Sequence, residues 1–444
     1  MLVRCAGFLL PWGTLRGMFM LILYNTLGRK RQVFRPVNDR VVNIFTCGPS
    51  VYQRAHIGNF RTFLFEDIVV RYLRYRGFRV VRGMNFTDVE DKAVSEALRR
   101  KMPLRKMTNA TIREFIREMR LLRIAVPEYL CRASEALDGA VAIVKLLLKR
   151  GIAYRYGNNI YFNTLTFPRL GVLAGIDSST WPVPRHRFHN DTYPGMRWNR
   201  GDFVLWHGCE GDYDVCWDAD IGHGRPAWNI QDASIIRGYI GETLSIYCGG
   251  IDNLVRHHDY SIAILESLRP YPMARFWLHG SHLLVGGKKM SKSTGNILYT
   301  DNLLGKGYDA GEIRFFLIYG HYRRNLNYAD QAMERTAGKL RAFRERVRSL
   351  QLRGRRASRA RESSLSRDVQ RSFERAMDDD LNVKAAFDGV AEIIRRPAMD
   401  TLTPAEVKAV AGVLDDADSV LQVMKPGKAR GASGSGRRRR STGR

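Results

Sequence analysis

Cysteine is scarce in this sequence, and long apolar runs are missing from it. Six cysteines occur among 444 residues, and none of them forms a CxxC pair. This usage argues against a disulfide-rich scaffold and favours a reducing, cytoplasmic setting. The apolar stretches at 6–12 and 18–24 are shorter than the roughly 18 residues that cross a bilayer, so we expect no membrane-spanning segment there. Residues 1–20 are expected to form an N-terminal extension; the open alternatives are a secretory leader or a true start at Met18 or Met20.

Acidic residues are also few compared with basic ones. The chain has 72 Lys and Arg against 44 Asp and Glu, which gives a formal net charge of +28. Such an excess attracts a polyanion, either nucleic acid or an acidic membrane surface. Ten basic residues and one acid lie between 339 and 361, and seven basic residues without an acid lie in 427–444. We therefore expect the polyanion at the C-terminal half, with 427–444 as a disordered basic tail. This placement makes attraction to a membrane the weaker explanation, and no membrane partner is expected.

The hydrophobic pattern predicts an α/β fold with a Rossmann-like, doubly wound parallel sheet. An apolar run at 41–45, a Gly48-Pro49 break, a helical period over 60–75 and a second apolar run at 78–81 are typical of a βαβ unit. Short strands and turns then indicate an inserted subdomain, at about 107–227, before α/β character returns at residue 228. The predicted domains are a Rossmann-like domain at 21–308, which contains the insertion, and a C-terminal α-helical bundle at 309–426.

Two short motifs carry the chemistry. His56-Ile57-Gly58-Asn59 begins the first predicted helix, where free backbone N–H groups and the helix dipole attract an anion. Lys289-Met290-Ser291-Lys292-Ser293 follows a predicted strand and the hinge-like pair Gly286-Gly287. A hinged loop with two lysines can close over a polyphosphate and neutralise the charge that builds as pyrophosphate leaves. Together the two motifs predict nucleotidyl transfer.

These motifs resemble the HIGH and KMSKS signatures of class I aminoacyl-tRNA synthetases, and their surroundings resemble the cysteinyl-tRNA synthetase family. The resemblance runs from about residue 21 to residue 390. Beyond the two motifs it is carried by Tyr24-Asn25-Thr26-Leu27, Thr46-Cys47-Gly48-Pro49-Ser50-Val51-Tyr52, Arg61-Thr62-Phe63, Asn85-Phe86-Thr87-Asp88-Val89-Glu90-Asp91-Lys92, Gly249-Gly250-Ile251-Asp252 with His257-His258, and Gly320-His321-Tyr322-Arg323 with Leu326-Asn327-Tyr328.

The resemblance implies that the 21–308 domain is catalytic, binds ATP with Mg²⁺ and activates an amino acid. Thr87 and Trp228 would line the amino-acid pocket, and Lys292 would lie on the leaving pyrophosphate. The implied catalytic residues are His56, Asn59, Lys289 and Lys292, and the implied nucleotide-binding residues are His56, Asn59, Gly250, Asp252 and Lys292.

The resemblance also implies a metal site, and here the sequence departs from the family. Its members hold zinc with two cysteines, a histidine and a glutamate, and the zinc selects the substrate thiolate. Cys47 and His257 match two of these ligands, but Asp232 stands at the second cysteine position and Ser261 at the glutamate position. Carboxylate oxygen is an acceptable zinc ligand and a serine hydroxyl is a poor one, so the candidate metal ligands are Cys47, Asp232 and His257.

The alternative at this site is that no zinc binds there. Cys47 and His257 would then be packed or hydrogen-bonded remnants, and Asp232 would face a cationic or polar group of an amino acid other than cysteine. In either case the substrate-binding set is Cys47, Thr87, Trp228, Asp232 and His257. Cys209, Cys216 and Cys248 are expected to be ordinary buried thiols, with a rearranged thiolate site as the alternative. The tandem His257-His258 with Asp259 could form a metal triad on its own, but the resemblance implies that His258 lies on the nucleotide side or has a structural role.

The expected function is ATP-dependent activation of an amino acid, cysteine by resemblance, and its transfer to the 3′ end of tRNA by a cytoplasmic monomer. One alternative is a ligase of the same type that uses another amino acid, or passes it to a small-molecule amine as the mycothiol-pathway ligases do. Another is a basic nucleic-acid-binding paralogue without catalysis. The net charge favours tRNA as the partner, although the helical domain lacks the extra small module with which long family members help to read the anticodon.

Overall fold

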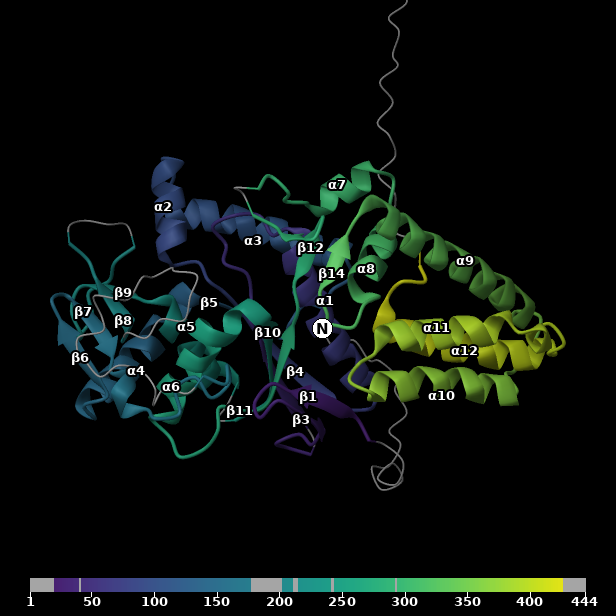
Figure 1. Cartoon of the computed structure of the whole chain (residues 1–444), viewed down its shortest axis with the longest axis horizontal. Helices are drawn as coiled ribbons and strands as arrows, with labels where there is room; N and C mark the ends of the chain where they lie inside the picture. Colours follow the sequence, from purple (N-terminus) through teal and green to yellow (C-terminus); the bar gives the residue numbers. More distant parts are fainter. Residues whose placement is uncertain are drawn as a thin grey trace, which may run out of the picture.

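A parallel β-sheet forms the centre of the molecule. The computed structural model of the chain describes residues 20–39, 41–176, 202–210, 215–240, 243–291 and 294–425. Five parallel strands lie in the order β11-β10-β3-β4-β5 (Figure 1). All seven residues of β10 are buried, as expected of a strand covered on both faces. The strands are β3 (Val41–Thr46), β4 (Arg79–Phe86), β5 (Tyr129–Arg132), β10 (Leu244–Gly250) and β11 (Ala274–Gly280).

The order of the strands in the central sheet indicates where a ligand binds. From β3 the chain crosses through helix α1 (Ile57–Tyr75) to β4 and then to β5, moving outward in one direction. It later returns to β10 on the other side of β3 and continues outward to β11. The winding therefore reverses between β3 and β10, and ligands of doubly wound sheets bind at the carboxyl ends of the strands at such a point. The predicted Rossmann-like sheet is confirmed.

A second, antiparallel sheet lies to one side of the parallel sheet, at the left of Figure 1. It has the order β6-β7-β8-β9 and falls within the stretch where we expect an insertion. The same stretch also contains β5, which pairs with β4 in the central sheet, so the expected insertion at about 107–227 is not one continuous subdomain. The elements are α2 (Asp91–Arg99), α3 (Leu104–Leu121), α4 (Leu137–Lys149), β6 (Ala153–Tyr156), β7 (Asn159–Phe162), β8 (Phe203–Gly208) and β9 (Gly224–Pro226).

The remaining elements of the sheet domain include two small sheets. A small hairpin of β1 and β2 precedes the central sheet, and a three-stranded sheet in the order β13-β12-β14 carries the second motif. The bounds are β1 (Ile22–Asn25), β2 (Lys30–Val33), α5 (Trp228–Ile235), α6 (Asp259–Glu266), β12 (Leu283–Val285), β13 (Lys288–Lys289), α7 (Thr300–Gly305) and β14 (Leu326–Tyr328).

The C-terminal part is an α-helical bundle that extends away from the sheet, at the right of Figure 1. Buried apolar residues of α1 belong to the same hydrophobic cluster as those of the bundle, so the two parts share one core. Several helices begin at side-chain caps, such as Ser363 before α10 and Thr403 before α12. The helices are α8 (Ala310–Ile318), α9 (Asp330–Gly354), α10 (Ser364–Asp378), α11 (Val383–Arg395) and α12 (Pro404–Leu421).

A buried ion pair joins the bundle to the sheet domain. Arg314 of α8 places Nη2 2.6 Å from Asp67 Oδ2 of α1, and neither side chain is exposed. Arg314 Nε also donates to the carbonyl of Leu421 in α12 at 2.6 Å, and Nη1 donates to the carbonyl of Leu122 at 2.9 Å. One side chain thus ties together the first helix of the sheet domain, the end of α3 and the last helix of the bundle.

The cysteines differ in part from the expectation. Cys209 and Cys216 form a disulfide and are half-buried, so the prediction of two buried thiols is wrong for this pair. The reason is local topology: β8 and β9 are antiparallel, and Trp217 pairs with Gly224, so the connection doubles back on itself. Cys248 is a buried free thiol, as predicted.

Among the helices in the described part of the chain, none combines the length and apolarity needed to cross a membrane. The expected extension at 1–20, apart from Met20, and the expected basic tail lie outside the described residues.

Candidate active site

A cavity of about 440 Å³ opens at the carboxyl ends of β3, β4 and β10. This is the point where the winding of the sheet reverses. Predicted residues from both halves of the reaction line it: the nucleotide-side residues His56, Asn59, Gly250 and Asp252, and the amino-acid-side residues Cys47, Thr87, Trp228 and His257.

The start of α1 is held by a reciprocal pair of hydrogen bonds. His56 Nδ1 accepts from the backbone N–H of Asn59 at 3.2 Å, and Asn59 Oδ1 accepts from the backbone N–H of His56 at 3.0 Å. Burial lowers the pKa of His56, so the imidazole is neutral near pH 7. Because Nδ1 is the acceptor, Nε2 carries the proton. The cap therefore fixes His56 as a hydrogen-bond donor beside the cavity.

Gly58 allows the second motif to approach this helix start. A Cβ atom at Gly58 would lie 2.5 Å from Met290 Cε and 3.0 Å from the His56 ring. Any larger residue would push the Met290 side chain away or displace His56. The glycine of the first motif is therefore explained by its contact with the second.

Lys289 extends toward Asp252, just beyond the end of β10. Its Nζ lies 3.5 Å from Asp252 Oδ2, and both side chains are more than half exposed. The strand that carries Lys289, β13, pairs with β12 in a hairpin. Lys292, which the sequence places on the leaving pyrophosphate, lies outside the described residues together with Ser293.

At the other end of the cavity Asp232 is the centre of a buried hydrogen-bond network. Its Oδ2 accepts from Tyr247 Oη at 2.5 Å and lies 2.7 Å from His257 Nε2, and its Oδ1 accepts from Asn85 Nδ2 at 2.9 Å. Burial opposes ionisation, but the charge of His257 and the hydrogen bonds of His257, Tyr247 and Cys47 together outweigh burial and lower the pKa of Asp232 below its usual value. Asp232 is thus a carboxylate that is fully removed from solvent.

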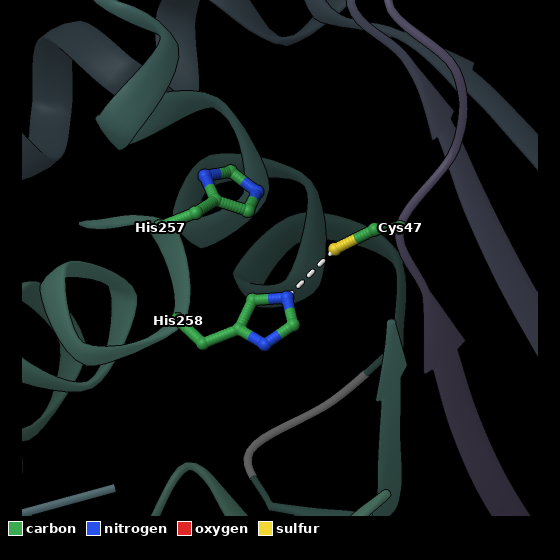
Figure 2. A group of neighbouring side chains, drawn as sticks. All are labelled: Cys47, His257 and His258. Carbon is green, nitrogen blue, oxygen red and sulfur yellow. Dashed lines mark hydrogen bonds between the residues drawn. The ribbon is translucent and has the colours of Figure 1, made fainter. Parts of the chain in front are cut away.

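Cys47 lies beside this carboxylate and contacts a second histidine. Its Sγ is 3.6 Å from Asp232 Oδ2 and 2.9 Å from His258 Nε2 (Figure 2). Burial, and next the charge of Asp232, raises the pKa of the Cys47 thiol well above its usual range. Potential metal-ligand atoms of Cys47, His257 and His258 all lie within 4.8 Å of one another. Of the two expectations for His258, the structural role agrees with its burial and its hydrogen bonds, whereas its contact with Cys47 places it at the amino-acid end of the cavity.

Ser261, at the position of the family glutamate, turns away from this group. Its hydroxyl donates to the backbone carbonyl of His257 at 2.9 Å, one turn earlier in the same segment. The structure thus brings Cys47, Asp232 and His257 together, as the sequence predicts, and leaves Ser261 out.

Sequence reasoning missed Tyr247, which bonds Asp232, and it named His258 without including it among the candidate metal ligands. The sequence signal for His258 was its position next to His257. In the structure both histidines lie in a widened helical turn, Leu254–His258, and such turns are frequent at functional sites. Tyr247 gave no signal, since it reads as one more residue of a buried strand.

The wall of the amino-acid pocket is aromatic. The Trp228 indole stacks on the His257 ring with centroids 4.4 Å apart and planes 5° from parallel. Trp228 is the first residue of α5, and Asp232 lies one turn later in that helix. Thr87, at the end of β4, accepts a hydrogen bond from Asn85 Nδ2 at 3.3 Å. The pocket is therefore closed on one side by the stack and on the other by the end of the sheet.

Eight of the ten basic residues in the run at 339–361 form two groups, and Lys339 and Arg348 belong to neither. Four of its arginines make internal contacts: Arg341 with Glu312, Arg344 with Asp309, and Arg346 and Arg353 with Asp400. The second group lies at and beyond the end of α9 and is exposed, with no side-chain ion pair in the described residues. We call it the α9 basic group; it consists of Arg355, Arg356, Arg359 and Arg361.

Comparison with known proteins identifies the family. The sequence model of the class I (C) tRNA synthetase catalytic domain matches residues 33–338. The chain is 36% identical to the cysteine--tRNA ligase of Chlamydia pneumoniae over 420 residues, which cover 91% of this chain and 86% of that protein. It is also 36% identical to the cysteine--tRNA ligase of Brachyspira hyodysenteriae over 318 residues, which cover 71% and 67% of the two chains.

Solved structures agree on the fold. The methionyl-tRNA synthetase of Mycobacterium tuberculosis in complex with methionyl-adenylate superposes with a TM-score of 0.61 at 14% identity and covers 87% of this chain and 90% of its own. The LeuRS of Agrobacterium radiobacter K84, in a ternary complex with tRNA and LeuAMS, gives a TM-score of 0.67 at 11% identity, with 88% and 85% covered. The resemblance drawn from the two motifs is confirmed, and the chain belongs to the class I tRNA synthetase family, in the branch whose curated relatives are cysteine--tRNA ligases.

Proposed function

We propose that the chain joins an amino acid, cysteine by family membership, to the 3′ end of tRNA at the expense of ATP. The observation that carries this proposal is the placement of His56, Asn59 and Asp252 around the same cavity as Thr87 and Trp228. In the first step the amino-acid carboxylate attacks the α-phosphorus of ATP and pyrophosphate leaves. In the second, a ribose hydroxyl of the tRNA end attacks the mixed anhydride and AMP leaves.

The chain contributes position and charge to these steps. His56 Nε2–H and the free N–H groups at the start of α1 donate to phosphate oxygens, where negative charge develops. Lys289 and Lys292, with Mg²⁺, neutralise the leaving pyrophosphate. No side chain needs to form a covalent intermediate, because holding two reactants in line supplies much of the acceleration.

The residues present also fit the zinc of the family. Thiolate, carboxylate and imidazole are all zinc donors, and Cys47, Asp232 and His257 would hold the ion. In addition, the Nδ1 atom of His257 is buried and has no hydrogen-bond partner among the described residues, which leaves one nitrogen of this ring free. Zinc bound there would supply a Lewis acid that prefers a substrate thiolate to a hydroxyl.

We further propose that the protein acts as a monomer in the cytoplasm, where ATP and tRNA are found. One chain supplies every side chain that lines the cavity. The Cys209–Cys216 disulfide is the feature least typical of that compartment.

Pyrophosphate exchange with each amino acid in turn, followed by charging of tRNA, tests the proposal. Exchange with cysteine alone and cysteine bound to tRNA are the expected results. Asp232 and Ser261 favour one competing outcome, exchange with a different amino acid, which would show that the pocket has changed its substrate. Transfer to a small-molecule amine but not to tRNA would overturn the proposed acceptor, and absence of exchange with any amino acid would leave only the nucleic-acid-binding alternative.

The second motif yields a prediction. Lys292→Ala is expected to abolish pyrophosphate exchange and to leave tRNA binding unchanged, because this lysine acts only on the leaving group. Lys288→Ala is the matched control: Lys288 is exposed on β13, one residue before Lys289. Equal exchange rates for Lys292→Ala and the unaltered chain would contradict the assignment of the ATP site.

A second prediction concerns the binding of tRNA by the α9 basic group. Replacing Arg355, Arg356, Arg359 and Arg361 by glutamine should weaken tRNA binding alike for different tRNA sequences, because phosphate contacts carry no sequence information. The slope of log K against log salt should become shallower by about 0.7 to 0.9 for each phosphate that the variant no longer neutralises. Arg341→Gln is the control, since Arg341 already pairs with Glu312 and Glu334. An unchanged slope in the fourfold variant would place the tRNA elsewhere.

A further inference from the structure

We infer that His258 is a ligand of the metal in this site and that it takes the place left open by Ser261. The inference rests on the proposed function, since the metal is the one proposed there for selecting the amino acid. The ligand set then has a single thiolate: Cys47, His257 and His258 offer ligand atoms that all lie within 4.8 Å of one another, and Asp232, which lies 3.6 Å from Cys47 Sγ and 2.7 Å from His257 Nε2, becomes the fourth ligand by a shift toward the ion.

The first support is position. His258 Nε2 lies 2.9 Å from Cys47 Sγ, and Cys47 Sγ lies 3.6 Å from Asp232 Oδ2. Ligand atoms around a tetrahedral zinc are about 3.3–3.6 Å apart, given Zn–S near 2.3 Å and Zn–N near 2.0–2.1 Å. The first pair therefore needs to open by only about half an ångström, and the second already has the spacing. Figure 2 shows the His258 ring directed at the sulfur.

The second support is a chain of hydrogen bonds behind His258. Its Nδ1 lies 2.8 Å from His279 Nε2, and His279 Nδ1 lies 2.8 Å from Thr26 Oγ1. A neutral imidazole donates at one nitrogen and accepts at the other, so protons along this chain must all point the same way. When Thr26 accepts, His279 donates to it and His258 donates to His279. The lone pair of His258 Nε2 then faces Cys47, which is the orientation that a metal requires.

Such an arrangement is characteristic of metal-binding histidines, which donate the second ring nitrogen to a fixed partner. Asp232 has partners of the same kind, because Asn85 and Tyr247 bond its two oxygens. Ser261 and His279 are both buried. The Ser261 hydroxyl bonds only the backbone carbonyl of His257, whereas His279 bonds the ring of His258. The surrounding shell thus supports His258 as it would support a ligand.

Charge gives the chemical consequence. Binding exchanges the Sγ–H bond of Cys47 for an Sγ–metal bond, and the proton leaves to solvent. One thiolate and one carboxylate then balance the two positive charges of the ion, whereas the two thiolates and glutamate of the family set exceed them by one. A neutral site attracts a substrate thiolate more strongly than an anionic site does. The changed ligand set therefore remains suited to cysteine.

X-ray absorption at the zinc edge of the purified full chain counts the ligands directly. We expect one zinc per chain, with one sulfur at about 2.3 Å and two imidazoles at about 2.0–2.1 Å. A spectrum with one imidazole, or a chain that binds no zinc after incubation with the ion, would overturn the inference. Because this measurement uses the unaltered protein, it does not depend on whether a variant folds.

Titration with Co²⁺ alone provides the test by substitution. The unaltered chain should show the visible bands of a four-coordinate ion and a thiolate-to-cobalt band. His258→Ala should lose the four-coordinate bands and at least 100-fold in affinity, and His279→Phe should keep them with about 10- to 100-fold weaker binding. His223→Ala is the control, because His223 is exposed and pairs with Asp218. An unaltered cobalt spectrum in His258→Ala would refute the assignment.

The two proposals fail in different ways. A zinc-free chain that still charges tRNA would overturn the ligand assignment and leave the proposed function in place. A chain with the expected zinc spectrum but without pyrophosphate exchange would overturn the proposed function and leave the ligand assignment in place.

Discussion

His56→Asn is expected to slow pyrophosphate exchange about 100- to 1,000-fold, the loss typical of one donor removed from a site of developing charge. Asparagine caps a helix well, so its side-chain oxygen can accept from the Asn59 N–H in place of His56 Nδ1. It has no group at the position of the ring Nε2–H. The substitution therefore removes the phosphate donor and keeps the helix start.

The rate should fall with little change in the KM for ATP, because the free N–H groups of α1 still bind the ground state and the lost bond matters most as charge develops. The unfolding temperature should stay within about 2 °C of that of the unaltered chain, since a good cap is exchanged for another. His223→Asn serves as a control outside the cavity. Exchange within threefold of the unaltered rate would show that His56 donates no hydrogen bond in the reaction.

Arg314→Met is expected to destabilise the protein by about 3–5 kcal/mol, the range found when one partner of a buried ion pair is removed. Asp67 would lose the guanidinium that lies 2.6 Å away, at a place without solvent. The carbonyls of Leu421 and Leu122 would also lose their donor. Methionine fills much of the volume, so the effect measures charge and hydrogen bonding more than packing.

Urea unfolding followed by circular dichroism measures this loss. Because Arg314 links α1, α3 and α12 and the two parts share one core, we expect a single transition whose midpoint moves to a lower urea concentration in the variant. The double variant Asp67→Asn/Arg314→Met should lose less than the sum of its single variants, since the two residues act as a unit. Arg341→Met, at a half-exposed arginine, should change stability by less than about 1 kcal/mol. A destabilisation of less than about 1 kcal/mol in Arg314→Met would contradict a structural role for the pair.

Much of the fold follows from local pattern. The apolar runs, the Gly48-Pro49 break and the helical period predict β3, α1 and β4, because period and breaker residues act over a few positions of the chain. The nucleotide side of the site is equally local: His56 and Asn59 are three residues apart and cap the same helix. The elements that hold these residues could therefore be predicted without knowledge of the packing.

Composition alone could not predict which basic residues are available to bind tRNA. The sequence predicts that the whole run at 339–361 holds a polyanion, but Arg341, Arg344, Arg346 and Arg353 pair within the protein. A count of charges cannot tell which of them have partners, because the partners Asp309, Glu312 and Asp400 come from elsewhere in the chain. The surface available to tRNA is accordingly narrower than the sequence suggests.

By itself the sequence determined the family, the two nucleotide motifs and the grouping of Cys47, Asp232 and His257. Only the tertiary structure decided that His258 joins this group, that Ser261 leaves it, and that Tyr247 bonds Asp232. These outcomes depend on which way a side chain points from a widened turn or a buried strand, and that direction is set by the neighbours packed against it. His279 and Thr26, which fix the orientation of His258, lie 21 and 232 residues away from it in the chain, so no local pattern could reveal them.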